Sequence, residues 1–259
     1  MSKAIILVAF GSTNLEGIEN SIGLLEENLN EVFGSEYTIF KSFTSNKIIN
    51  LLKERYDYLV PHLNKLLFNL VNQGYDEVII QPLHIMNTGE IKKIEEIVDE
   101  YRYSMKKILI CKTLFSNDEQ TLLKESHEIA DIICADLDES NILLVGHGSK
   151  RNSNKLYDVI AETVRERCNK KVYLATLEGE KNFNLAIDEI VKDNVKKIFI
   201  KSLFIIPGKH VVDDILSGDN SLVKKIENLG VEVKMKESSL LQYYKIRKLY
   251  VENIKNNIN

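Results

Sequence analysis

Three side chains of the kinds that bind metal ions follow strand-like apolar runs in the second half of the chain. His147 comes directly after one such run, Glu178 ends the next, and His210 follows a third within Pro-Gly-Lys-His. Because parallel strands present their carboxyl ends at one edge of a sheet, we expect these side chains to gather there. Two imidazoles and one carboxylate suit a divalent transition metal and leave coordination positions open. The pattern predicts a metal site that exchanges its ion or performs catalysis.

Each of these residues also has an ordinary structural explanation, since a His or Glu at a helix start is often a cap or a loop residue. The convergence of three strand ends favours the metal site. The turn at 146–149, Gly-His-Gly-Ser, is also compatible with phosphate binding at a helix N-terminus. However, Arg151 stands where a dinucleotide fingerprint needs its third glycine, and the P-loop pattern is absent. Nucleotide binding is therefore not expected.

Apolar, β-branched runs alternate with helical patterns along the whole chain. This alternation predicts parallel strands joined by crossover helices. The run at 4–10 is continuously apolar, which is typical of a strand buried on both faces. Further strands are expected near residues 37–43, 77–82, 107–114, 141–145, 171–177, 197–203 and 231–236, and a closing helix is expected at 240–256.

The two halves of the chain match in local sequence. Residues 7–13 resemble residues 144–150, and residues 77–85 resemble residues 197–205. Duplication is the simplest account, and it predicts an α/β fold of two lobes, each a parallel sheet flanked by helices, with a cleft between them. The lobes are expected at 1–118 and 119–259, with the alternative that the closing helix packs on the first lobe. One doubly wound sheet, in which buried strands are alike by chance, is the competing interpretation.

Composition and charge exclude several classes of protein. With 259 residues, 44% apolar and 28% charged, and only 12 Gly and 3 Pro, the chain is typical of a globular protein of one or two domains. A net charge of −4, from 34 basic and 38 acidic side chains, disfavours a nucleic acid partner. No apolar run approaches the ~20 residues that span a bilayer. No secretory cleavage site is evident either, so we expect a cytoplasmic protein without membrane contact.

The cysteines suggest no metal cluster. Cys111, Cys134 and Cys168 form no Cys-x-x-Cys pair, and their odd number suits a reducing compartment. We expect all three to fill the core.

Three motifs together resemble one enzyme family. These are Leu-Val-Gly-His-Gly-Ser at 144–149, Thr-Leu-Glu-Gly at 176–179 and Pro-Gly-Lys-His-Val-Val-Asp-Asp at 207–214. The combination resembles the anaerobic cobalt chelatases of cobalamin biosynthesis, which act on sirohydrochlorin, and the resemblance spans essentially the full chain. It implies a fold similar to that of the ferrochelatases, in which two α/β lobes clasp a tetrapyrrole. It also implies ATP-independent insertion of Co²⁺ as the substrate metal.

By this resemblance, His147, Glu178 and His210 are the metal ligands and catalytic residues, and a histidine also accepts pyrrole protons. Insertion must remove two N–H protons from the macrocycle while a partly desolvated ion reaches its face. A neutral imidazole that can leave the metal and take a proton suits this task. In the first lobe, Phe10 is the counterpart of His147 and Glu90 is the counterpart of His210.

A macrocycle rich in carboxylates calls for cations and hydrogen-bond donors nearby. The residues expected to contact it are Phe10, Ser12, Glu90, Ser149, Lys150 and Lys209. Glu90 is expected to act as a second acid and His84 to be structural. The alternatives are solvated cations for the lysines and helix caps for the serines.

The ligand set does not select cobalt, because Ni²⁺ and Cu²⁺ bind such sites more tightly. An iron or nickel chelatase acting on a similar tetrapyrrole remains an alternative, as does a non-catalytic carrier of a metal or tetrapyrrole. The sequence leaves the oligomeric state open, since the apolar face of the helix at 240–256 suits either the core or a homo-oligomer interface.

Overall fold

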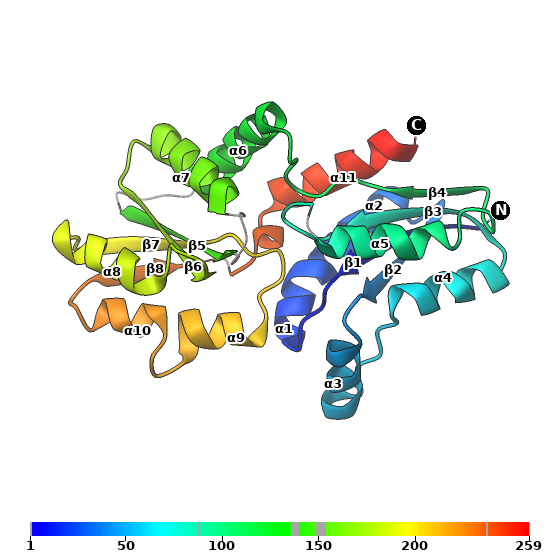
Figure 1. The fold of residues 1–259 in the computed structure, drawn as a ribbon, viewed down its shortest axis with the longest axis horizontal. Helices are drawn as coiled ribbons and strands as arrows, with labels where there is room; N and C mark the ends of the chain where they lie inside the picture. The colour runs from blue at the N-terminus through cyan, green and yellow to red at the C-terminus, as the bar shows by residue number, and fades with distance from the viewer. Residues whose placement is uncertain (1, 88, 136–139, 149–153, 237, 259) are drawn as a thin grey trace. The chain divides into compact units, whose positions relative to one another are not determined.

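The computed structural model describes residues 2–87, 89–135, 140–148, 154–236 and 238–258. The chain divides into two compact units (Figure 1). The first consists of Met1–Asn117 and Tyr244–Asn259, and the second of Asp118–Tyr243. The chain first passes from one unit to the other between residues 117 and 118, one residue from the boundary expected at 118/119. The closing helix, which the sequence assigned first to the second lobe, instead belongs to the first unit.

The first unit is built on a parallel sheet in the order β2-β1-β3-β4. Its central strand β1 is fully buried from Ala4 to Val8, which explains the uninterrupted apolar run. The helices α4 and α5 cover one face of the sheet, where their leucines and isoleucines pack against alternate residues of β1. The strands are β1 (Ser2–Ala9), β2 (Tyr37–Phe43), β3 (Tyr75–Pro82) and β4 (Lys107–Ile110).

Helices flank this sheet, and the last of them comes from the end of the chain. They are α1 (Leu15–Ile18), continued by a π-helical turn at Glu19–Gly23, α2 (Leu24–Phe33), α3 (Asn46–Tyr56), α4 (Leu63–Asn72), α5 (Gly89–Asp99) and α11 (Tyr244–Ile258). The amide of Asn253 on α11 donates to the Gln81 side chain at 3.0 Å, and Arg247 Nε donates to Asn28 at 2.6 Å. Gln81 is fully buried, so its side chain needs such partners. These contacts attach α11 to the first unit.

The second unit repeats the same topology, with a parallel sheet in the order β6-β5-β7-β8. In the first sheet Leu83 N donates to Val8 O at 2.7 Å, and in the second Leu203 N donates to Val145 O at 2.8 Å. The two sequence matches align Val8 with Val145 and Leu83 with Leu203, so the same hydrogen bond occurs at equivalent positions of both sheets. Duplication is confirmed, and two separate four-stranded sheets replace the alternative of one doubly wound sheet. The strands are β5 (Asn141–Gly148), β6 (Val172–Glu178), β7 (Lys197–Ser202) and β8 (Glu232–Met235).

The second sheet lies between two layers of helices (Figure 1). The helices α8 and α10 pack on one face through Ala186, Ile190 and Ile226, and α6 and α7 pack together and cover the other. The helical elements are α6 (Glu119–Cys134), α7 (Asn154–Cys168), α8 (Phe183–Lys192), α9 (Lys209–Val212), a π-helical turn at Asp213–Ser217, α10 (Leu222–Glu227) and a 3-10 turn at Leu240–Gln242.

Two expectations from the sequence are wrong. The strand expected at 107–114 is shorter than that and ends at Ile110. Directly after it, Cys111 N still donates a hydrogen bond to Ile80 O of β3 at 2.8 Å. The three cysteines do not all fill the core, because Cys134 and Cys168 form a disulfide while Cys111 stays buried and free. Their sequence spacing does not reveal that α6 and α7 end side by side. Over the described ranges, no helix is long and apolar enough to cross a membrane.

Candidate metal and tetrapyrrole site

The glycines around His147 allow two backbones and one ring to approach closely. A Cβ on Gly146 would collide with the Tyr157 ring. Gly148 has φ of +70°, and a Cβ there would collide with the carbonyl oxygen of Glu178. Only glycine combines this left-handed conformation with so little space. The Gly-His-Gly pattern therefore serves to present the histidine at a tightly packed strand end.

Tyr157 on α7 packs against this strand end, with its ring next to Gly146. Its side chain is 4% exposed, and burial raises the pKa of its phenol, partly offset by hydrogen bonds to the backbone of Gly148 and His147. The phenol therefore stays protonated and holds the backbone on both sides of the exposed imidazole. The sequence analysis missed Tyr157, although a tyrosine on the apolar side of the next helix was a visible signal.

The His147 imidazole is exposed at the end of β5. Nδ1 lies 3.3 Å from the carbonyl oxygen of Gly148, and the ring meets Phe204 edge-on with centroids 6.5 Å apart. This contact is a hydrogen bond only in the tautomer that carries its hydrogen on Nδ1. The lone pair is then on Nε2, the atom available to a metal ion or a pyrrole proton.

Glu178 ends β6 next to this histidine. In the β5–β6 ladder Gly148 pairs with Glu178, so His147 and Glu178 lie diagonally across adjacent strands. The turn after β6 is closed by Thr176, whose hydroxyl donates to the carbonyl oxygens of Glu178 at 2.8 Å and Lys181 at 3.1 Å. The Glu178 carboxylate is exposed and makes no hydrogen bond or ion pair with the residues that the structure describes. It is available for a ligand.

The third strand end leads into α9. Ser239 Oγ donates to Ile205 O at 2.5 Å, and Leu240 N donates to Phe204 O at 2.7 Å, which fastens the loop after β7. His210 is the second residue of α9, and Lys209 before it is exposed. The His210 side chain, like Ser149 and Lys150, lies outside the described residues. Among those described, no three His, Cys, Asp or Glu side chains form a metal-binding group, so the His, Glu, His set stays a prediction.

At the end of β1, Phe10 and Ser12 have different environments. The Phe10 side chain is 48% exposed. Ser12 is only 3% exposed, and its hydroxyl accepts a hydrogen bond from Asn14 N at 3.1 Å. Asn14 in turn caps α1 through a hydrogen bond from Gly17 N. The environment of Ser12 is that of a loop-forming residue.

Glu90 lies in the first turn of α5 and is held by two partners. Thr44 Oγ1 donates to one carboxylate oxygen at 3.4 Å, and Lys93 Nζ lies 2.5 Å from the other. Thr44 itself is fixed by His62, whose Nε2 donates to the Thr44 carbonyl oxygen at 3.1 Å while Nδ1 accepts from Asn64 N at 3.3 Å. The sequence analysis missed Thr44 and His62, because this chain of contacts joins segments far apart in sequence.

His84 follows β3 near the same edge. Both ring nitrogens are shielded from solvent and have no hydrogen-bond partner within the described part of the chain. Burial lowers the pKa of His84, and the negative charge of Glu90 opposes this shift. The imidazole is therefore neutral at pH 7, which agrees with the structural role expected for it.

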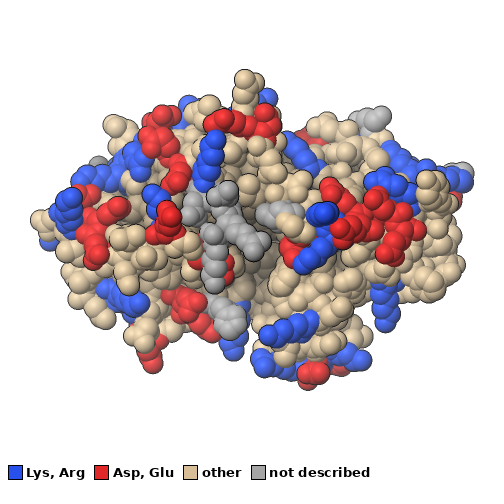
Figure 2. Space-filling view, viewed as in Figure 1, with Lys and Arg blue, Asp and Glu red and all other residues tan. Residues whose placement is uncertain are grey.

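The surface of the two units shows no basic stripe on the side in view. Figure 2 shows acidic and basic side chains interspersed over the visible face of each unit. This mixture agrees with the small net charge of −4.

Comparison with known proteins decides the family. A family model described as cobalt chelatase (CbiK) matches residues 3–259. This chain belongs to the cobalt chelatase family. The resemblance inferred from the three motifs is thereby confirmed.

Individual relatives are distant in sequence, and three of them match over at least 95% of their length. The chain is 24% identical over 263 residues to the sirohydrochlorin cobaltochelatase of Salmonella typhimurium, covering 100% of this chain and 97% of the relative. Its fold is similar to that of SirB from Bacillus subtilis with Fe³⁺, with a TM-score of 0.66, 20% identity and coverage of 100% and 98%. SirB from Bacillus subtilis subspecies spizizenii in complex with cobalt gives 0.62, 17% identity and coverage of 99% and 95%. These structures establish the chelatase-like fold.

Proposed function

We propose that this cobalt chelatase family member inserts Co²⁺ into sirohydrochlorin, giving cobalt-sirohydrochlorin for anaerobic cobalamin biosynthesis. The observation that carries the proposal is the pairing of Gly148 with Glu178, which brings an exposed imidazole and an exposed carboxylate, unpartnered among the described residues, to one sheet edge. The name of the Salmonella relative supports the metal and the macrocycle. We place the reaction in the cytoplasm.

In this proposal the metal is a substrate that the protein holds briefly. His147, Glu178 and His210 bind Co²⁺, and the carboxylate offsets one of its two charges while positions stay open for the incoming pyrrole nitrogens. We propose the exposed His147 imidazole as the base. Once that imidazole leaves the metal, it can accept a pyrrole proton.

The reaction exchanges two N–H protons for one divalent ion, so charge balances and no electron is transferred. ATP is not required for such an exchange in this proposal. The glycines of the turn at 146–148 support this, because Gly146 packs closely against Tyr157 and Gly148 against Glu178. Packing therefore explains these glycines without a phosphate-binding loop. The first unit contributes Glu90, which we propose as the acceptor of a second proton.

The remaining residues proposed for the macrocycle act through shape and charge. Phe10 offers an exposed ring that suits the flat face of a tetrapyrrole. Lys209, Lys150 and Ser149 are proposed to bind its carboxylates. Ser12 is proposed to act by shaping the loop after Phe10, since its hydroxyl accepts from Asn14 N.

A multiple-turnover assay tests the function. Sirohydrochlorin is mixed with catalytic protein and Co²⁺, Fe²⁺ or Ni²⁺ in turn, and the absorbance of the macrocycle is followed. We expect many equivalents of product per protein with Co²⁺. Conversion that stops at one equivalent would indicate a carrier, and faster turnover with Fe²⁺ or Ni²⁺ would replace cobalt as the metal.

A further inference from the structure

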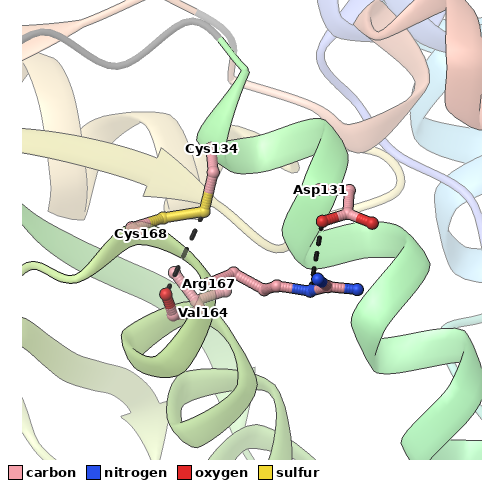
Figure 3. The surroundings of a disulfide bond; sticks show 5 residues. All are labelled: Asp131, Cys134, Val164, Arg167 and Cys168. Carbon is pink, nitrogen blue, oxygen red and sulfur yellow. Dashed lines mark hydrogen bonds and ion pairs between the residues drawn. A yellow bond between two sulfur atoms is a disulfide. The ribbon is translucent and has the colours of Figure 1, made fainter.

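The disulfide joins the last residues of two neighbouring helices (Figure 3). Cys134 ends α6 and Cys168 ends α7, and their Cα atoms are 5.7 Å apart, within the usual range for a disulfide. An ion pair joins the same two helices close to the disulfide, since Arg167 Nε lies 3.2 Å from Asp131 Oδ1. Arg167 is the residue before Cys168 on α7, and Asp131 lies about one turn before Cys134 on α6. Packing and an ion pair thus hold the two cysteines together independently of the covalent bond.

The two cysteines of the disulfide are less buried than the third cysteine. Cys134 and Cys168 are partly exposed, whereas Cys111 is 3% exposed and burial raises the pKa of its thiol to about 12. Reactive cysteines are partly exposed and lie in electropositive surroundings. In the sequence, Arg165, Arg167 and Lys170 lie within three residues of Cys168, with Glu166 among them. Cys111 therefore serves as an unreactive internal reference.

The bond closes a covalent ring around the strand that carries His147. The cysteines are 34 residues apart, and the whole of β5 lies between them. Directly after the ring, Lys171 O accepts from Ile142 N at 3.0 Å at the start of the β5–β6 pairing. The ring therefore encloses one candidate ligand and ends next to the strand that carries Glu178.

We propose that Cys134 and Cys168 are a reversible dithiol–disulfide site, and that its oxidation state sets the stability of the second unit. The substrate class is a dithiol in one direction and a disulfide in the other. This inference does not depend on the metal-insertion reaction, because it rests on the positions of the two cysteines alone.

The exchange balances without further reagents. A thiolate of the dithiol attacks one sulfur, the S–S bond breaks, and the other cysteine leaves as a thiolate that takes up a proton. The second thiol of the reductant then attacks the mixed disulfide and releases the first cysteine. Two electrons and two protons pass from the dithiol, which becomes a disulfide, and a disulfide oxidant reverses the sequence.

The consequence follows from the size of the ring. A cross-link that closes a loop of this length restricts the unfolded chain and shifts the unfolding equilibrium several-hundred-fold, on the order expected from loop-closure entropy. The β5–β6 and β5–β7 ladders hold the strand ends without the help of the bond, so we expect them to persist when it is broken. Reduction should therefore leave the strand ends in place at low temperature and make the second unit unfold more readily on heating.

The experiment uses the full-length chain equilibrated in buffers with increasing ratios of reduced to oxidised dithiothreitol. Each sample is quenched, unfolded and alkylated, and its mass gives the number of free thiols, while a parallel sample is unfolded thermally. We expect one free thiol in the oxidised and three in the reduced protein. The oxidised protein should melt about 10 °C higher.

Two variants complete the test. The Cys134→Ser/Cys168→Ser double variant should melt like the reduced protein in every buffer, and Cys111→Ser should keep the full redox response. Three free thiols in the oxidising buffer, or a melting temperature that ignores the buffer, would overturn the proposal. Reduction that occurs only after unfolding would show a permanent structural cross-link and would equally contradict a reversible site.

Discussion

Replacing Gly148 with Ala tests the claim that close strand packing presents the candidate ligands. The backbone at Gly148 has φ of +70°, a conformation that costs an alanine about 1 kcal/mol or more. Its new Cβ would collide with Glu178 O and would lie 2.7 Å from Thr176 Cβ. Because one of these atoms belongs to the backbone, β5 must move away from β6, and such overpacking costs about 2 kcal/mol. We expect a total loss of about 3 kcal/mol in the free energy of unfolding of the second unit.

Function should suffer as well as stability, since the displaced strand β5 carries His147 and adjoins Glu178. A shift of about 1 Å between reacting groups costs on the order of 100-fold in rate. We therefore expect kcat/KM for Co²⁺ insertion to fall by about this factor at a temperature where the variant remains folded. Urea unfolding measures the first effect and the absorbance assay measures the second.

Gly208→Ala is the matched control. Gly208 also follows a strand of the second sheet and precedes a candidate ligand, but a Cβ there would meet nothing within 4 Å. Its stability should change by no more than about 0.5 kcal/mol. If Gly148→Ala were as stable and as active as Gly208→Ala, the packing argument for the Gly-His-Gly pattern would be refuted.

Three further changes test other parts of the site. Glu178→Gln should abolish Co²⁺ insertion without unfolding the protein, whereas Glu180→Gln, an exposed neighbour in the same turn, should behave like the parent; equal activities of the two variants would remove Glu178 from the ligand set. Thr44→Val removes the hydroxyl that donates to Glu90, so kcat should fall about tenfold with an unchanged KM for sirohydrochlorin, and an unchanged kcat would show that Glu90 needs no such support. Because the folded-state pKa of His84 is lowered, the unfolded chain binds the extra proton first, and stability should decrease as the pH falls through about 6.5 towards the folded value, by at most about 1.4 kcal/mol per pH unit. His84→Asn should flatten this slope in urea unfolding measured from pH 8 to pH 5, and an identical slope would contradict the assignment.

The duplicated fold was predictable because its signals are local. A parallel strand buried on both faces must be continuously apolar, as Ala4–Val8 is, and the turn after it must contain glycine where φ is positive. Both signals recur in the second half, at 142–145 and at Gly148. The same locality placed His147 and Glu178 at strand ends, where the structure shows them exposed.

The supporting contacts of the candidate site were not predictable in the same way. Tyr157 lies on α7, and His62 lies ahead of α4, so neither adjoins in sequence the backbone that it supports. Their role depends on the angle at which a helix or loop returns to the sheet. No pattern of apolar and polar residues encodes that angle residue by residue.

The sequence by itself determined the kind and order of elements and the strand ends at which chemistry-bearing side chains appear, because burial and backbone conformation impose residue types directly on each segment. Tertiary structure alone decided which distant segments touch. Cys134 meets Cys168 because α6 and α7 pack side by side on one face of the sheet, and α11 returns to the first unit because Gln81 and Asn28 offer it partners there. Such contacts depend on how whole elements pack, so they emerge only when the complete chain has folded.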